Sequence, residues 1–279
     1  MRAAVLGSPV DHSKSPQLHL AAYRALGLDD WTYERRECSA EQLPGLVDGL
    51  DSDWVGLSVT MPGKVAALHF ASSRTDRAIL AGSANTLVRT PAGWHADCTD
   101  VDGVRGALEE NGVTDLADRS VLVLGAGGTS RPALIALAAL GAASATVVAR
   151  SAVRAADTVE CGTAAGLDTR FLPMDAASLA DAAAESAVVV STVPSSGAAS
   201  VASALAHAPV VLDAIYDPWP TPLAEAVVAA GGTIVSGLAM LLNQAYGQVE
   251  QFTGQPAPKA AMRRAIEADP PSEAGTQRA

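Results

Sequence analysis

Val121-Leu122-Val123-Leu124-Gly125-Ala126-Gly127-Gly128 is the strongest fold signal in this chain. Four apolar residues typical of a buried strand run directly into a glycine-rich turn, and a helix is expected from about Thr129. Gly125 permits a tight turn between strand and helix. Gly127 lacks the side chain that would keep a pyrophosphate away from the backbone N–H groups at the helix start. The stretch therefore predicts a dinucleotide-binding turn.

The end of the next apolar segment indicates which dinucleotide this turn would bind. An NAD site places Asp or Glu about 20 residues beyond the glycines, where the carboxylate accepts hydrogen bonds from the free ribose hydroxyl. This chain has Arg150 at that position, with Ser151 and Arg154 close behind. Arginines suit a ribose phosphate, so the sequence favours NADP, although two solvated arginines at a helix start would look the same.

A glycine-rich turn alone is weak evidence, because any tight turn between a strand and a helix resembles it. The chain after Gly128 adds support, since apolar strands alternate there with alanine-rich helical segments. Together with the strand at 121–124, six strands are expected, as in a doubly wound nucleotide-binding fold. The other five are expected near 145–149, 169–172, 187–191, 210–214 and 233–236.

Length, charge and cysteine spacing limit the class of protein. The chain has 279 residues, enough for roughly two domains, and its net charge of -11 argues against nucleic acid or an anionic membrane as a partner. Cys38, Cys98 and Cys161 show no spacing typical of a metal site or a disulfide framework. No signal sequence or membrane-spanning run of about 20 apolar residues is found. We therefore expect a cytoplasmic protein without a metal.

Lys64 is a candidate acid–base group. Lysine can release its proton, whereas arginine cannot, and this chain has only three lysines. An apolar strand ends near Thr60 and breaks at Pro62, and the following helix carries Lys64 in its first turn. Thr60 and Lys64 are therefore expected at the carboxyl end of a strand, where open α/β sheets bind ligands. The positive end of the helix dipole is expected to lower the lysine pKa, although most lysines are ordinary surface residues.

The segment Ser13-Lys14-Ser15-Pro16 follows the first strand and starts a helix. We expect Ser15 to be the N-cap and Pro16 to occupy the first helical position, where its missing N–H costs nothing. Two hydroxyl groups at a helix N-terminus, from Ser13 and Ser15, also suit a bound carboxylate.

Asp100 is the candidate partner of Lys64. A hairpin formed by 87–90 and 94–98 delivers it to the start of another helix, where an aspartate also serves as an ordinary N-cap. Next to Lys64, it would hold the ammonium group and share a proton with a substrate oxygen.

Taken together, these motifs resemble shikimate dehydrogenase, and the resemblance spans about residues 4–255. Their order and spacing match from end to end. The resemblance implies an oxidoreductase that reversibly reduces 3-dehydroshikimate to shikimate with NADP, in aromatic amino acid biosynthesis. The matching motifs are Ser13–Pro16, Val59–Lys64, Ser83–Thr86, Thr99–Gly103, Gly125–Gly128, Asp213–Tyr216 with Pro220–Leu223, and Gly237–Gln244.

The same resemblance implies roles for individual residues. Lys64 and Asp100 would be the catalytic pair, and the lysine would exchange the proton at the carbonyl oxygen while hydride moves to or from the nicotinamide. The substrate would contact Ser13, Ser15, Thr60, Asn85, Tyr216 and Gln244. NADP would contact Gly125, Ala126, Gly127, Gly128, Thr129, Arg150, Ser151, Arg154 and Gly237. One departure is Cys98, which stands where the family has asparagine; we expect it to slow turnover.

We expect two α/β domains. Residues 1–102 would form a substrate-binding catalytic domain completed by C-terminal helices in 237–268. Residues 103–236 would form a Rossmann-type, doubly wound NADP-binding domain, and 269–279 a disordered tail. The protein would be a monomer or a homodimer.

Three other functions remain open. A quinate/shikimate dehydrogenase that prefers NAD belongs to the same family, but Ser13 and the two arginines weigh against it. Methylenetetrahydrofolate dehydrogenases share the two-domain plan and an active-site lysine, but not the Ser-Lys-Ser motif combined with Asn85 and Asp100. A regulatory module that binds NADP without turnover is the non-enzyme alternative, and the presence of both Lys64 and Asp100 argues against it.

Overall fold

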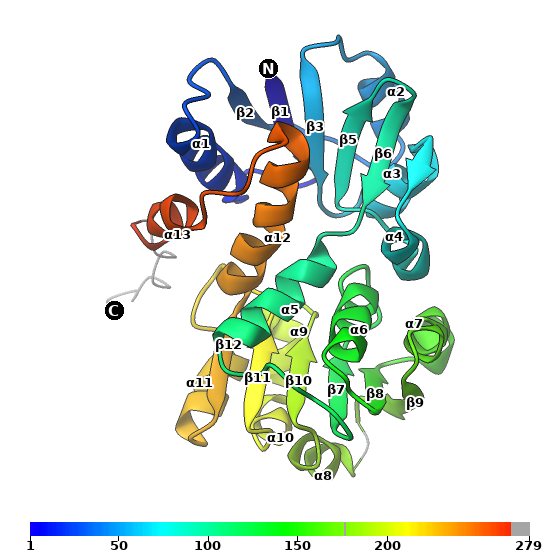
Figure 1. Ribbon diagram of the computed structural model, residues 1–279. Coiled ribbons are helices and arrows are strands. Elements are labelled where there is room, and N and C mark those ends of the chain that lie inside the picture. Colours follow the sequence, from blue (N-terminus) through cyan, green and yellow to red (C-terminus); the bar gives the residue numbers. More distant parts are fainter. Residues whose placement is uncertain (176, 269–279) are drawn as a thin grey trace, which may run out of the picture. The chain divides into compact units, whose positions relative to one another are not determined.

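The computed structural model describes residues 1–175 and 177–268, so the expected tail at 269–279 lies outside the described residues. Two compact units are present, and each contains a six-stranded sheet (Figure 1). Among the described residues, the first unit comprises Met1–Gly103 and 241–268, and the second comprises Val104–Met240. The α/β fold class predicted from the sequence is confirmed.

The first unit has a mixed sheet of order β2-β1-β3-β5-β6-β4. β1, β2 and β3 run parallel, whereas β5 pairs antiparallel with both β3 and β6. The strands are β1 (Arg2–Gly7), β2 (Thr32–Glu37), β3 (Trp54–Val59), β4 (Ser73–Arg74), β5 (Thr86–Thr90) and β6 (Gly93–Asp97). The helices are α1 (Ser15–Ala25), α2 (Leu43–Asp48), α3 (Lys64–Phe70), α4 (Asp76–Ala81), α12 (Gly237–Thr253) and α13 (Lys259–Glu267), with α5 (Asp100–Glu110) leading into the second unit.

A glycine in the middle of β3 lets α12 lie against this sheet. A Cβ atom at Gly56 would fall 2.1 Å from the ring of Phe252, which is buried. Only glycine leaves room for the aromatic ring at this point. The helix that carries Gln244 is therefore packed on the strand that leads to Thr60 and Lys64.

The second unit has an all-parallel sheet of order β12-β11-β10-β7-β8-β9. Read from its other edge, this is the doubly wound order 3-2-1-4-5-6, with the switch point between β7 and β10. All six predicted strands are confirmed: β7 (Ser120–Leu124), β8 (Ser144–Ala149), β9 (Asp168–Pro173), β10 (Val188–Ser191), β11 (Val210–Asp213) and β12 (Thr233–Ser236).

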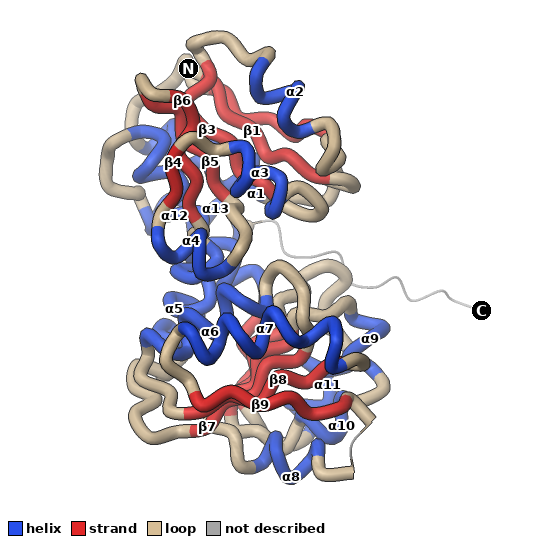
Figure 2. The backbone as a smooth tube through the Cα atoms, turned by 90° about the vertical axis from the view of Figure 1, so that its right-hand side faces the viewer, coloured by secondary structure: helices blue, strands red, loops and turns tan. Residues whose placement is uncertain are grey.

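Helices cover both faces of this sheet, with α6 and α7 on one face and α8 and α10 on the other (Figure 2). The helices of this unit are α6 (Ser130–Ala139), α7 (Ala152–Ala164), α8 (Leu179–Ala184), α9 (Ser195–Ala199), α10 (Ala202–Leu205) and α11 (Pro222–Ala229). Because both faces are covered, the central strands β7, β10 and β11 are apolar over most of their length rather than alternating, which made them recognisable in the sequence, whereas the edge strand β9 is partly exposed.

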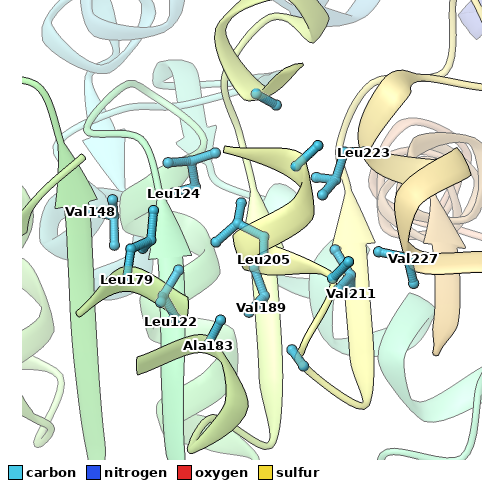
Figure 3. Packing of buried hydrophobic residues seen from close by; sticks show 14 of the residues in the cluster. Leu122, Leu124, Val148, Leu179, Ala183, Val189, Leu205, Val211, Leu223 and Val227 are labelled. Carbon is cyan, nitrogen blue, oxygen red and sulfur yellow. The ribbon is translucent and has the colours of Figure 1, made fainter. Parts of the chain in front are cut away.

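The core on one face of the parallel sheet consists of aliphatic side chains only (Figure 3). Leu122 and Val189 from neighbouring strands contribute to it, and Leu205 and Leu223 come from the helices that cover them. All four side chains are fully buried. Removal of this apolar area from water is the main term that stabilises the unit.

One expectation about the first helix is wrong. Ser15 is the first residue of α1, and Lys14 occupies the N-cap position without a side-chain capping bond. The Ser15 hydroxyl instead accepts a hydrogen bond from Ser13 Oγ at 3.2 Å, and Ser13 Oγ accepts one from the Ser15 N–H at 3.3 Å. The serine that engages the backbone here is therefore Ser13, because its hydroxyl lies outside the helix and can reach the exposed N–H.

Val189→Ala should lower the free energy of unfolding of the second unit by about 2 kcal/mol, because it leaves a cavity among fully buried side chains. Val228→Ala on α11 is the matched control, since Val228 is 62% exposed and alanine favours the helix. Denaturant unfolding of both variants measures the difference. Equal stability of the two variants would contradict the packing described for this core.

Candidate active site

Lys64 and Asp100 form an ion pair in the first unit. The Lys64 Nζ atom lies 2.6 Å from Asp100 Oδ2, and the two side chains are 16% and 7% exposed. Each residue is the first of its helix, α3 and α5 respectively. Two helix starts that are far apart in the sequence therefore bring an ammonium group and a carboxylate into contact.

The effect of this pair on the lysine pKa is opposite to the one expected from the sequence. Burial alone would lower the pKa of Lys64, but the nearby Asp100 carboxylate, through its charge and its hydrogen bond, raises it above the ordinary value. The expectation of a lowered pKa considered only the helix dipole, and the direct ion pair outweighs that weaker effect. Without a ligand, Lys64 is thus held as an ammonium group.

Asn85 orients the carboxylate of this pair from the other side. Its Nδ2 amide group donates to Asp100 Oδ1 at 3.0 Å and to Gln244 Oε1 at 3.1 Å. Its Oδ1 atom accepts a bond from the Thr99 N–H at 2.8 Å. Asn85 is 3% exposed, so a buried amide fixes Asp100 and Gln244 relative to each other.

Gln248 is a further buried residue of this network that the sequence analysis missed. Its Nε2 atom donates to the Asn85 carbonyl at 3.1 Å and to Thr86 Oγ1 at 3.0 Å, and its Oε1 atom accepts from Ser58 Oγ at 2.7 Å. One signal could have found it, because Gln248 follows Gln244 by one helical turn and so lies on the same face of α12.

The predicted carboxylate-binding serines lie at the carboxyl edge of the same sheet. Ser13 and Ser15 are 7% and 3% exposed, and the guanidinium of Arg35 donates two bonds to the Ser13 carbonyl. Thr60 follows the neighbouring strand β3, and its N–H donates to the Leu6 carbonyl of β1 at 2.8 Å. The loops that carry Ser13 and Thr60 therefore leave the sheet at the same end.

The predicted nucleotide-binding residues of the second unit surround one cavity of about 510 Å³. This volume lies in the range of small-molecule sites. Six of the predicted cofactor residues line it: Gly125, Ala126, Gly127, Arg150, Ser151 and Arg154. Leu124, Val148, Ala149, Met174 and Val193 supply the remaining, largely apolar wall.

The turn after β7 has the shape expected of a phosphate-binding loop. Gly125 has φ +114, and a Cβ atom there would lie 2.4 Å from Thr192 Oγ1. Ser130, at the third position of the pattern, is fully buried and hydrogen-bonds Thr192 Oγ1 at 2.7 Å and the Gly127 N–H at 3.1 Å. Serine in place of the usual glycine thus ties the turn to the neighbouring strand β10.

Four other residues of the second unit that the sequence analysis assigned to the cofactor or substrate site do not line this cavity. Gly128 and Thr129 lie between the turn and α6, and Tyr216 lies in the loop after β11. Gly237 begins α12, where a Cβ atom would lie 2.2 Å from the Ala214 carbonyl oxygen, so glycine is required there for packing alone. Contacts of these four residues with substrate or cofactor remain predictions.

Cys98 shows no sign of nucleophilic chemistry. Its side chain is fully buried, and burial, reinforced by the Asp100 carboxylate, raises the pKa of its thiol far above the ordinary value. Across residues 1–175 and 177–268, no group of three or more His, Cys, Asp and Glu side chains is arranged to hold a metal ion. Within the same ranges, no helix is long and apolar enough to cross a bilayer.

Comparison with known proteins finds two matching family models and a series of relatives. Residues 5–87 match the family model described as the shikimate dehydrogenase substrate binding domain, and residues 237–267 match the shikimate 5′-dehydrogenase C-terminal domain. Shikimate dehydrogenase (NADP(+)) of Thermosynechococcus vestitus is 34% identical, over 94% of this chain and 93% of that protein.

Two solved structures are more similar still. The crystal structure of Mycobacterium tuberculosis shikimate dehydrogenase is 61% identical, with a TM-score of 0.91, over 96% of this chain and 99% of that one. A shikimate 5-dehydrogenase from Mycobacterium fortuitum is 62% identical, with a TM-score of 0.86, over 95% and 97%. With this identity along nearly its whole length, the chain belongs to the shikimate dehydrogenase family.

Proposed function

We propose that this protein catalyses the reversible NADPH-dependent reduction of 3-dehydroshikimate to shikimate, a step in aromatic amino acid biosynthesis. The observation that carries the proposal is the buried Lys64–Asp100 ion pair in a member of this family, with Asp100 held by Asn85, which also binds Gln244. In such a pair, the lysine ammonium group supplies an exchangeable proton, and the aspartate carboxylate holds the ammonium group in place.

In the reduction, the Lys64 ammonium group donates its proton to the carbonyl oxygen of the substrate. Bound NADPH supplies the hydride for the carbonyl carbon. In the reverse direction the neutral amine of Lys64 accepts the hydroxyl proton. Asp100 stabilises the ammonium form, so that the lysine regains its proton from solvent after each reduction.

The substrate is a small hydroxylated acid, and the first unit offers groups suited to each of its parts. The hydroxyls of Ser13 and Ser15 bind its carboxylate at the start of α1, where the helix dipole favours an anion. Thr60, Asn85, Asp100 and Gln244 hydrogen-bond its ring hydroxyls, and Tyr216 lies beside it.

The cofactor is NADP, which binds in the cavity of about 510 Å³ beside the turn at Gly125. The N–H groups at the start of α6 hold the pyrophosphate, and Gly128, Thr129 and Gly237 complete the site. Arg150 directly follows β8 and Arg154 lies in the first turn of α7; both are exposed and pair with the ribose phosphate, while Ser151 adds a hydroxyl.

The proposal extends to domain roles, assembly and location. Residues 1–102, with the helices of 237–268, bind the substrate, and residues 103–236 bind NADP. The protein acts in the cytoplasm as a monomer or a homodimer. All three cysteines are free and buried, which suits a reducing compartment.

The direct test is the absorbance change of the nicotinamide with shikimate or quinate as substrate and NADP or NAD as cofactor. We expect turnover with shikimate and NADP. Preferential turnover of quinate, or a preference for NAD, would favour the quinate/shikimate dehydrogenase alternative. No turnover in any of the four combinations would favour a binding module without activity.

Lys64→Ala should lower kcat for shikimate by about 10²–10⁴-fold, because it removes the group that exchanges the proton. NADP binding, measured by fluorescence titration, should not change. Lys259→Ala on α13 is the control for loss of a lysine charge and should retain full activity. A Lys64→Ala variant as active as the control would refute the role of this lysine.

Arg150→Ala and Arg154→Ala should each raise KM for NADP by about 10–100-fold and leave KM for NAD within about twofold, since only NADP carries the additional phosphate. Arg119→Ala is the control, because Arg119 is exposed in the loop before β7, at the opposite end of that strand from the glycine turn. Equal effects on NADP and NAD would show that the arginines do not recognise the phosphate.

A further inference from the structure

Asp97 is a buried carboxylate with no part in the proposed chemistry. It is the last residue of β6 and is 3% exposed. Its Oδ1 atom accepts hydrogen bonds from the Cys98 N–H at 2.7 Å, Thr75 Oγ1 at 2.8 Å and Arg77 Nε at 2.7 Å. Its Oδ2 atom accepts from Arg77 Nη2 at 2.5 Å and Gln251 Nε2 at 2.8 Å. Five donors therefore converge on one carboxylate.

Arg77 extends this cluster to the other side of Asp100. While two of its nitrogens hold Asp97, its Nη1 atom donates to Asp102 Oδ2 at 2.6 Å. Asp97 precedes Asp100 by three residues and Asp102 follows it by two. One guanidinium group from α4 thus binds both flanks of the turn that carries the Asp100 carboxylate, and its planar fork makes that arrangement rigid.

Gln251 connects the cluster to α12. This helix also carries Gln244, which shares the Asn85 amide with Asp100. Thr75, the third side chain bound to Asp97, caps the start of α4 by accepting a bond from the Ala78 N–H at 3.3 Å. Asp97 therefore links α4, α5 and α12 at the point where Asp100 begins its helix.

The Asp97 carboxyl group is held in its ionised form, because its surroundings lower its pKa. Burial alone would raise the pKa of Asp97, but the hydrogen bonds and charge of Arg77, with the bonds from Thr75 and Gln251, lower it to about 2. The charged and titratable groups around Asp97 are Arg77, the Cys98 thiol and, through Arg77, Asp102; those around Lys64 are Asp100 and the Cys98 thiol. Asp97 is thus a fixed negative charge throughout the range in which enzymes are assayed.

We propose that Asp97 is a positioning residue of the reaction, which acts through Arg77 and Gln251 to hold the Asp100 carboxylate in contact with Lys64. The inference rests on the proposed catalytic roles of Lys64 and Asp100. If Asp97 has this role, its loss should change the pKa of Lys64. Burial disfavours the Lys64 ammonium group, and only the close carboxylate overcomes that effect, so a looser Asp100 lowers the lysine pKa.

The test is Asp97→Asn in the full chain. Asparagine has the same shape as aspartate but no charge. Its amide N–H groups would also face the N–H donors of Arg77 or Gln251, so at least one hydrogen bond of the cluster is lost. We expect kcat for the reduction of 3-dehydroshikimate to fall about tenfold or more, with KM for both substrates within about twofold. The basic limb of the pH profile of kcat/KM should shift about one unit lower, because reduction needs the protonated lysine.

Two further variants separate positioning from folding. Arg77→Lys keeps the positive charge but loses the planar guanidinium group that binds Asp97 and Asp102 together. We therefore expect the basic limb of the kcat/KM pH profile to shift lower, by less than in Asp97→Asn. Glu109→Gln breaks an exposed ion pair with Arg105 on α5, in which both side chains are 45% exposed, and should leave kcat and the pH profile unchanged.

The outcomes distinguish this inference from the proposed function. An Asp97→Asn enzyme whose basic limb stays in place, or whose activity falls only with the folded fraction seen by circular dichroism, would overturn the positioning role. If the unmodified protein does not oxidise shikimate, or if Lys64→Ala is fully active, the proposed function itself fails. Activity of the unmodified protein with an unshifted Asp97→Asn profile refutes the positioning role alone.

Discussion

The contact between the Lys64 ammonium group and the Asp100 carboxylate is the interaction around which the first unit is organised. Two charges at this degree of burial are stable only when they are close together and their remaining hydrogen-bonding groups are satisfied. Asn85 meets this requirement directly by donating to Asp100, while Arg77 and Asp97 hold the residues on either side of Asp100 in place from two other segments. The mixed sheet brings those segments together, because β3 and β6 both pair with β5, and β3 leads into α3 as β6 leads into α5.

The second unit depends on a different constraint, the absence of side chains at one turn. The backbone at Gly125 has a positive φ and approaches Thr192 too closely for a Cβ atom. The turn lies beside the switch point of a parallel sheet, and the cavity next to it is lined mainly by residues that end and follow β7 and β8, with Met174 and Val193 from the loops after β9 and β10. We propose that strand order and glycine placement create a nucleotide site here, and that the arginines after β8 set its preference for a particular nucleotide.

Local patterns in the sequence predicted much of this arrangement and failed where long-range contacts outweighed them. The apolar run at 121–124 and the five runs after Gly125 located all six parallel strands, since a strand buried on both faces needs no alternation. The N-cap expected at Ser15 was wrong, because Ser13 Oγ accepts the hydrogen bond from the Ser15 N–H. The lowered pKa expected at Lys64 was also wrong, because the Asp100 carboxylate raises it. Asp97 gave no signal, since an aspartate at a strand end is ordinary until Arg77 and Gln251 are seen to meet it.

The sequence by itself determined the fold class, the glycine turn, the arginines that follow β8, and the motifs that resemble shikimate dehydrogenase. These properties depend on residues close together in the chain, where periodicity, glycine placement and capping act directly. Long-range packing alone shows that Lys64 meets Asp100, that Asn85 and Gln248 connect β3 and β5 with α5 and α12, and that Asp97 joins α4, α5 and α12. Such contacts join residues up to 190 positions apart in the chain, so they arise from strand order and helix packing rather than from any local pattern.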